Sequence, residues 1–179
     1  ESQKRYYLGN NVASSTYLRN PANIFIEGMP VGLFYGYKTD GIVKEGETGV
    51  PIEKGGTPRE PGQIRYVDMN SNGYIDEFDR TIIGDNNPDF TYGFQTSFKF
   101  YGFNLSLNFD GVFGKDILYA NYAQVTDAQY SYCNNVIREA FYDAWTPENP
   151  DAKFPKINGG LSNNERAYVS DRMIHDASY

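Results

Sequence analysis

The sequence predicts an all-β-dominated chain whose antiparallel strands form part of a transmembrane β-barrel, with long extracellular loops and one short helix. Tyr (16) and Phe (12) are unusually abundant for 179 residues, and this favours β-structure, glycan-binding surfaces or the aromatic girdles of membrane barrels. Two long alternating segments, 90–100 and 103–113, flank the dipeptide Tyr101-Gly102. No run of about 18 apolar residues is present, so no helix in the sequence can span a bilayer.

The alternating segments predict a hairpin over residues 90–113 with a tight turn. In each segment, large apolar residues alternate with polar residues and glycine, as they do on the two faces of a strand. Each strand has about 11 residues, and at about 3.3 Å per residue with a tilt near 45° it would cover the ~25 Å apolar band of a membrane barrel. The apolar face consists of Phe90, Tyr92, Phe94, Phe98, Phe100, Phe103, Leu105, Leu107, Phe109 and Gly111.

The same alternation also fits a soluble β-sandwich with one buried face. Soluble strands are typically about 5–6 residues long, so two long strands joined by a minimal turn favour the barrel. In the barrel interpretation the aromatic face contacts outer-membrane lipid, and the polar face contacts a water-filled lumen. The alternative interpretation is a secreted, calcium-stabilised β-sandwich that binds glycans.

Outside the hairpin, residues 1–30 suggest strand fragments, and alternation from Val31 to Lys38 predicts a strand with glycines on one face. Alternate glycines would let another backbone or a packed plug approach closely. Residues 43–61 lack periodicity and predict a loop, whereas residues 63–67 predict a strand.

A short helix is predicted over residues 134–145, inside an extracellular loop region that spans residues 114–179. Asn134 or Asn135 could cap its start, and Thr146-Pro147 would end it. Trp145 is interpreted as an apolar anchor, with sugar stacking as the alternative.

Residues 68–79 match the calcium-loop pattern D-x-[DN]-x-[DN]-G with an acidic residue at position twelve. Calcium takes six to eight oxygen ligands, and Gly73 permits the sharp turn that would gather them. The closing residue is Asp rather than the usual Glu. The candidate ligands are the side chains of Asp68, Asn70, Asn72, Asp76 and Asp79 and the backbone carbonyl of Tyr74.

The alternative for this loop is an Asx-rich turn in which Asp68, Asn70 and Asn72 accept hydrogen bonds from backbone amides without a metal. No amphipathic helix precedes Asp68, so a helix-loop-helix calcium sensor is not expected. A bound Ca²⁺ would therefore be structural and would hold the loop in one conformation rather than cause a conformational change.

The remaining composition excludes several classes of function. A net charge of −7 with no basic cluster argues against nucleic-acid binding. The only cysteine, Cys133, is interpreted as an inert loop or packing residue, and the only histidine, His175, as a surface or packing residue. The best-organised carboxylates have metal-loop spacing rather than a catalytic arrangement, so the chain is not expected to be an enzyme.

Several ordered motifs resemble the C-terminal barrel region of SusC/RagA proteins, which are TonB-dependent outer-membrane proteins. The resemblance runs from about residue 20 to the end of the chain and depends on the order and spacing of motifs that are individually modest. The motifs are EGxPxGxFYGYKxDG (27–41), PGxIxYVD (61–68), DRxIIG (79–84), PDFTYGF (88–94), GFxLSL (102–107), GVFG (111–114) and WTxENP (145–150).

The resemblance implies that residues 1–179 are a fragment, truncated at both ends, of a TonB-dependent receptor barrel in the bacterial cell outer membrane. Such proteins import oligosaccharides, peptides or other nutrients. A SusD-like surface lipoprotein serves as their lid, and TonB couples energy through a part of the parent protein that is absent here.

Overall fold

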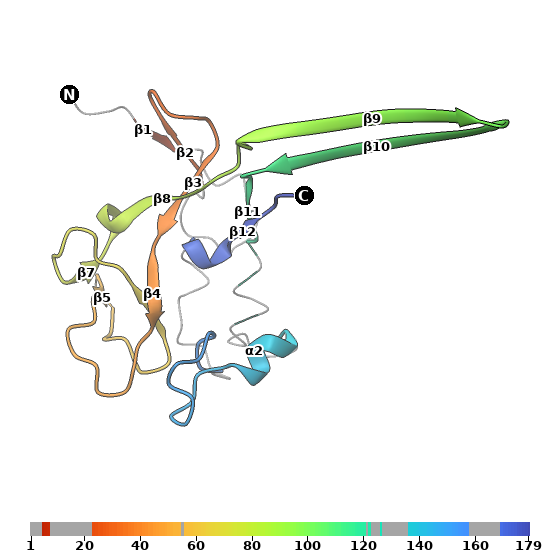
Figure 1. Cartoon of the computed structure of the whole chain (residues 1–179). Coiled ribbons are helices and arrows are strands. Elements are labelled where there is room, and N and C mark those ends of the chain that lie inside the picture. Colours follow the sequence, from red (N-terminus) through yellow and green to blue (C-terminus); the bar gives the residue numbers. More distant parts are fainter. Residues whose placement is uncertain are drawn as a thin grey trace.

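The computed structural model describes residues 5–7, 23–54, 56–120, 122, 126, 136–157 and 169–179. Short strands and loops form a body, and one long hairpin projects from it (Figure 1). The predicted dominance of antiparallel strands is confirmed, since among the described strands only the β5–β7 pair is parallel. The described strands form open sheets and do not close into a barrel. Among these residues, no helix is both long and apolar enough to cross a membrane.

The largest sheet in the described part of the chain has the strand order β1-β2-β3-β8 and is antiparallel throughout. A β-bulge between Phe34 and Tyr35 shifts the register of β3 against β8. The strands are β1 (Arg5–Tyr7), β2 (Asn23–Ile26), β3 (Leu33–Tyr37) and β8 (Arg80–Asp85). All residues of β3 are buried, so this strand forms the centre of the sheet.

Two smaller pairs of strands lie beside this sheet. Strand β4 (Thr39–Ile42) pairs antiparallel with β6 (Ile64–Tyr66), which confirms the strand predicted over residues 63–67. Strand β5 (Ile52–Glu53) pairs in parallel with β7 (Tyr74–Ile75) and interrupts the predicted loop 43–61. The 3₁₀ helix η1 (Glu77–Asp79) then leads into β8.

The hairpin has the predicted bounds, with β9 (Phe90–Phe100) and β10 (Phe103–Phe113) paired along their whole length. Tyr101 (φ 44°) and Gly102 (φ 85°) form the turn. A two-residue turn with positive φ at both positions matches the right-handed twist of the strands and therefore fixes the register. Phe90 stacks on Phe113 across the strands, with 5.1 Å between ring centroids.

The chain after the hairpin returns to the body. Strand β11 (Asp116–Leu118) pairs antiparallel with β12 (Ile174–Asp176), which follows the 3₁₀ helix η3 (Asp171–Met173). Tyr179 and Val112 exchange two backbone hydrogen bonds, each with N···O 2.9 Å, so the last described residue pairs with the free edge of β10.

The helix α2 (Arg138–Tyr142) is shorter than the predicted helix 134–145. Asn134 and Asn135 lie outside the described residues, and Ile137 precedes the helix without a side-chain cap. The helix ends early because Asp143 and Trp145 make backbone hydrogen bonds with Phe154 instead of continuing the helical pattern. Trp145 therefore follows the helix rather than closing it.

Two clusters of buried side chains form the core of the described residues. One lies in the β1-β2-β3-β8 sheet around Ile24, Leu33 and Tyr35. The other joins the β4-β6 and β5-β7 pairs to the segment after α2, and it consists of Tyr37, Ile42, Ile64, Tyr66, Ile75, Trp145 and Ala152. Trp145 is only 8% exposed, which agrees with its interpretation as an apolar anchor.

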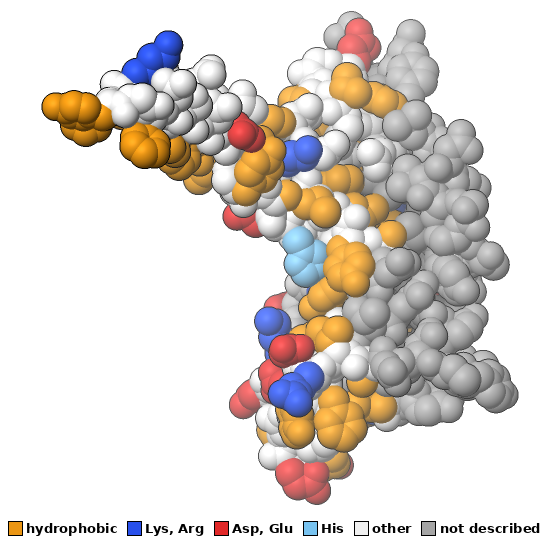
Figure 2. Space-filling model, turned by 90° about the vertical axis from the view of Figure 1, so that its right-hand side faces the viewer, with side chains coloured by type: hydrophobic (Ala, Val, Ile, Leu, Met, Phe, Trp, Pro, Cys, Tyr) orange, Lys and Arg blue, Asp and Glu red, His pale blue; other side chains and the backbone are white. Residues whose placement is uncertain are grey.

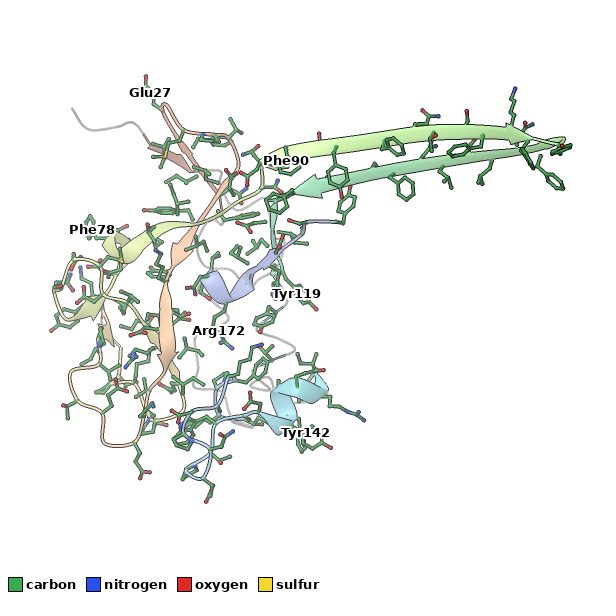
Figure 3. The ribbon with its side chains drawn as sticks, in the orientation of Figure 1. Glu27, Phe78, Phe90, Tyr119, Tyr142 and Arg172 are labelled. Atoms are coloured by element: carbon green, nitrogen blue, oxygen red, sulfur yellow. The ribbon has the colours of Figure 1, made fainter. Side chains whose placement is uncertain are left out.

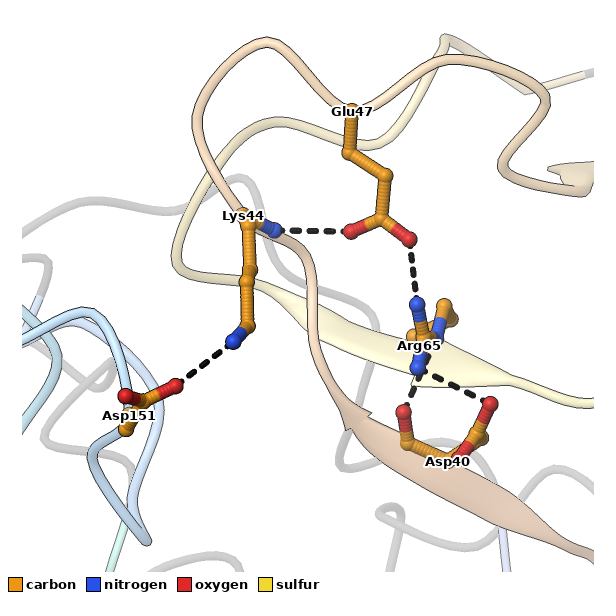
Figure 4. Close-up of polar contacts among 5 residues, drawn as sticks. All are labelled: Asp40, Lys44, Glu47, Arg65 and Asp151. Atoms are coloured by element: carbon orange, nitrogen blue, oxygen red, sulfur yellow. Dashed lines mark hydrogen bonds and ion pairs between the residues drawn. The ribbon is translucent and has the colours of Figure 1, made fainter.

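Polar contacts at the surface join the same segments (Figure 4). Arg65 on β6 donates to the Glu47 carboxylate and, at 2.9 Å, to the Asp40 carboxylate. Lys44 donates to Asp151 at 2.6 Å and so links the loop after β4 to the segment after α2. Both partners of the Lys44–Asp151 pair are largely exposed, so we expect it to stabilise the fold by less than about 1 kcal/mol.

The glycine face predicted for β3 is confirmed at Gly36. A Cβ atom there would collide with the backbone carbonyl of Val169 and would lie 2.9 Å from Ile83 Cδ1. Gly32 differs, because it precedes the strand, has φ 88° and has no neighbour within 4 Å of a built Cβ. The close approach thus comes from the backbone before η3, which bonds to Tyr37 N.

We expect Gly36→Ala to destabilise the protein by about 1–3 kcal/mol, because backbone atoms must move to accept the methyl group. Gly93→Ala is the matched control, since a Cβ at Gly93 meets only the Phe109 carbonyl, at 4.0 Å. Thermal unfolding of both variants measures the difference. Equal stability of the two variants would contradict the close packing at Gly36.

Candidate functional site

The loop 68–79 folds into a tight curl that is held by its own side chains. The Asp68 carboxylate accepts hydrogen bonds from the backbone amides of Asn72 (3.3 Å) and Gly73 (2.6 Å). Asn70 Oδ1 accepts from Asn72 N at 3.0 Å, and Asn72 Oδ1 accepts from Tyr74 N at 2.7 Å. These are the backbone contacts expected of an Asx-rich turn. Ser71 and Gly73 have positive φ, of 59° and 83°, at the sharpest part of the curl.

Asp79 closes the loop from within. Its side chain is fully buried, with Oδ1 accepting from Met69 N (2.9 Å) and Oδ2 from Asp76 N (2.8 Å). Asp76 in turn accepts from Phe78 N, so the two aspartates form a reciprocal cap on η1. One carboxylate therefore ties the start of the loop to its end.

The electrostatics of the loop favour ionised Asp68. Partial desolvation raises the pKa of this carboxyl, but backbone N–H groups, led by that of Gly73, outweigh it and hold the pKa below its usual range. Because the pKa of Asp68 is lower in the folded state than in the unfolded state, its ionised carboxylate stabilises the fold. This stabilisation is present above the ordinary aspartate pKa and is lost as the pH falls through the lowered value. Asp68 is therefore ionised at neutral pH.

The structure brings the candidate calcium ligands onto one short curl but does not converge their carboxylates. In the described part of the chain, no group of three or more His, Cys, Asp or Glu side chains is arranged to hold a metal ion. The donor set still fits calcium chemically, because it is all oxygen and each accepting carboxylate oxygen can use a second lone pair. The predicted calcium site stays a prediction.

The apolar face of the hairpin is largely exposed among the described residues, as Figure 2 shows for the arm that extends from the body. Tyr179 contacts it near its base, where the Tyr179 carbonyl accepts a hydrogen bond from Tyr92 Oη at 3.4 Å. A large ring covers Gly111, where a Cβ would collide with Tyr92. Leu107 on this face is partly buried. The other large apolar side chains of the face are between 51% and 79% exposed; they are Phe90, Tyr92, Phe94, Phe98, Phe100, Phe103, Leu105, Phe109 and Phe113. These side chains form one continuous apolar patch, unlike the single hydrophobic residues that are scattered over the surfaces of most soluble proteins.

Two other residues singled out in the sequence have simple packing roles. His175 is exposed and makes edge-to-face contacts with Tyr119 and Tyr122, at 5.9 and 4.9 Å between ring centroids. This agrees with its interpretation as a surface or packing residue. Cys133 lies outside the described residues.

Comparison with known proteins gives one consistent result. No family model matches the chain. Among curated proteins, TonB-dependent receptor P3 of Formosa agariphila is 27% identical over 167 residues, which is 93% of this chain. TonB-dependent receptor P26 of the same organism is 29% identical over 154 residues, and TonB-dependent receptor P39 is 32% identical over 111 residues. The chain is similar to TonB-dependent receptors.

The similarity to TonB-dependent receptors covers 93%, 82% and 62% of this chain for the three relatives. The chain spans only 16%, 15% and 11% of the length of the same relatives. The finer resemblance to the SusC/RagA group stays a prediction.

Sequence reasoning missed one group of residues that the fold brings together. A pocket next to Tyr122 places Arg172 and Lys153 beside Thr39, although these residues are far apart in the chain. No motif or periodicity connects these positions. Only the pairing of β4 with β6 and the return of the chain at η3 make them neighbours.

Proposed function

We propose that the chain is part of a TonB-dependent outer-membrane transporter of the SusC/RagA group, and that the hairpin is a piece of its lipid-facing wall. The relatives are TonB-dependent receptors, which are transporters rather than enzymes. The observation that carries the proposal is the hairpin: two 11-residue strands with one uncovered aromatic face and one polar face. These lengths and this alternation match a strand pair that crosses a bilayer.

The proposed transporter imports oligosaccharides or other nutrients together with a SusD-like lipoprotein, and TonB supplies the energy coupling. The resemblance of the ordered motifs supports these partners. The proposal also includes a structural Ca²⁺ in the loop 68–79, held by oxygens of Asp68, Asn70, Asn72, Tyr74, Asp76 and Asp79. Bound calcium would supply positive charge that holds the curl closed.

Fractionation of cells that express the full-length native protein tests the proposal. We expect the protein in the outer membrane, with heat-modifiable migration on gels and co-purification of a SusD-like lipoprotein. These three results are independent of the imported nutrient. A protein that stays in the aqueous phase and migrates normally would instead support the calcium-stabilised glycan-binding sandwich.

Calcium binding is tested on the same purified protein by calorimetry after chelation and by thermal unfolding with and without Ca²⁺. We expect calcium to raise the unfolding temperature, since a ligand that binds only the folded state stabilises it. Asn70→Ala should weaken this effect, because it removes one oxygen ligand. Asn87→Ala is the control, as Asn87 is an exposed amide outside the loop. An identical response of wild type and both variants would remove the calcium site from the proposal.

A further inference from the structure

The body of the structure holds a cavity of about 340 Å³ between β4, β6 and the residues around Arg172. It is called the cationic pocket here, and its lining residues are Thr39, Gly41, Ile42, Ile64, Tyr122, Ala152, Lys153 and Arg172. Its floor is apolar, because Ile42, Ile64 and Ala152 are buried core residues. Among the described residues, its polar lining consists of Lys153, Arg172, Tyr122 and Thr39.

The charge of this pocket is opposite to that of the chain. The chain has a net charge of −7, yet among the described residues no Asp or Glu lines the cavity. The Asp171 carboxylate adjoins its Thr39 wall, where it accepts from Thr39 N at 3.2 Å and from Thr39 Oγ1 at 2.7 Å. Two residues that line the pocket, Lys153 and Arg172, are cations, and an apolar floor strengthens their field.

An aromatic ledge, consisting of Tyr119, Tyr122 and His175, adjoins the pocket through Tyr122. The three rings contact one another edge to face, with centroid distances of 4.9–6.1 Å. Tyr119 is 43% exposed and His175 is exposed, and Figure 2 shows the imidazole at the surface beside apolar side chains. The Arg172 guanidinium carbon lies 5.8 Å from the centroid of the Tyr122 ring, so Arg172 is next to one ring of the ledge.

Figure 3 shows Tyr119 and Arg172 between the base of the hairpin and α2, and Tyr122 belongs to both the ledge and the pocket lining. A sugar ring of a ligand that lies against the ledge would therefore have the cationic pocket beside it. Flat apolar faces of sugars suit aromatic rings, whereas carboxylate and sulfate groups suit guanidinium and ammonium groups.

We propose that the cationic pocket and the aromatic ledge together bind a saccharide that carries an anionic group. The sugar ring lies on Tyr119 and His175, and its carboxylate or sulfate accepts hydrogen bonds from Arg172 and Lys153. This inference deepens the proposed transport function, on which it rests, by assigning a charge to the transported sugar. Carboxylate and sulfate share the required chemistry, and the experiment distinguishes them.

The test is calorimetry on the full-length native protein with three probes: an oligogalacturonate, a sulfated galacto-oligosaccharide and a neutral malto-oligosaccharide. We expect at least one anionic probe to bind about tenfold or more tightly than the neutral probe, the scale of one charge-assisted hydrogen bond. The anionic probe that binds identifies the group as carboxylate or sulfate. Equal affinity for all three probes would overturn the proposal.

Variants localise the binding. Lys153→Gln removes a charge from an exposed side chain and should weaken the anionic probe about fivefold to tenfold without changing affinity for the neutral probe. Lys99→Gln, which removes the same charge on the hairpin, is the matched control. Arg172→Lys keeps the charge but loses the planar fork, so it should weaken a carboxylate probe more than a sulfate probe. If Lys153→Gln and Lys99→Gln bind alike, the pocket is not the site.

Failure of this inference is distinguishable from failure of the transport proposal. A protein that fractionates as an outer-membrane barrel but does not prefer anionic sugars overturns only the inference. A protein that is absent from the outer membrane but binds anionic sugars through Lys153 supports the site and overturns transport.

Discussion

Phe109→Arg is expected to prevent stable insertion of the hairpin into the outer membrane. Phe109 lies near the middle of β10, faces Phe94 across the strands with 6.3 Å between ring centroids, and is 56% exposed. An arginine at the lipid-facing midplane of a barrel costs about 2–4 kcal/mol. Quantification of the protein in outer-membrane fractions, together with its heat-modifiable migration, measures the loss.

Asn108→Arg is the matched control for this prediction. Asn108 is the adjacent residue, pairs with Gln95 and lies on the opposite face of the same strand. In the barrel interpretation this face contacts water, so the variant should insert normally. If both variants insert equally well, or if Asn108→Arg fails more severely than Phe109→Arg, the assignment of the lipid-facing side is wrong.

Asp79→Ala is expected to destabilise the body by about 2–4 kcal/mol even without calcium. The carboxylate is fully buried and accepts hydrogen bonds from Met69 N and Asp76 N. Its removal leaves two backbone donors without their acceptor, and each such loss costs about 1–3 kcal/mol. Chemical denaturation of chelated protein gives the change in the free energy of unfolding.

Asp68→Ala separates the structural role of the loop from metal binding. Asp68 also accepts hydrogen bonds from two backbone amides but is partly exposed, so water can replace its carboxylate and the destabilisation of the chelated protein should be much smaller. Both variants should weaken calcium binding if the proposed site exists. A chelated Asp79→Ala protein as stable as wild type would show that the buried carboxylate does not hold the loop closed.

The local patterns of the sequence predicted the parts of the fold that depend on neighbouring residues. The hairpin bounds follow from strict alternation and from Tyr101-Gly102, which adopts positive φ at both turn positions. The curl at the start of the loop 68–79 follows from Gly73 and from the side chains of Asp68, Asn70 and Asn72, whose hydrogen bonds to backbone amides reach only two to five residues along the chain. Such features need no information about distant segments.

Features that depend on distant segments were not predictable. The helix was predicted too long because apolar residues after Tyr142 have helical spacing, although Trp145 N actually bonds to the Phe154 carbonyl. The cationic pocket joins Thr39 to Lys153 and Arg172, and no pattern in the sequence connects these three positions. In the first case a tertiary contact outweighs the local helical preference, and in the second the tertiary fold alone brings the residues together.

The two long strands also affect how the isolated chain would behave in water. Within the described residues, β9 and β10 pair only with each other, except where Tyr179 bonds to Val112. Their outer edges thus present rows of backbone donors and acceptors next to an aromatic surface. Such edges act as templates for further strands, so separately expressed copies of this chain are prone to edge-to-edge aggregation. Light scattering of this chain with and without detergent would detect such association.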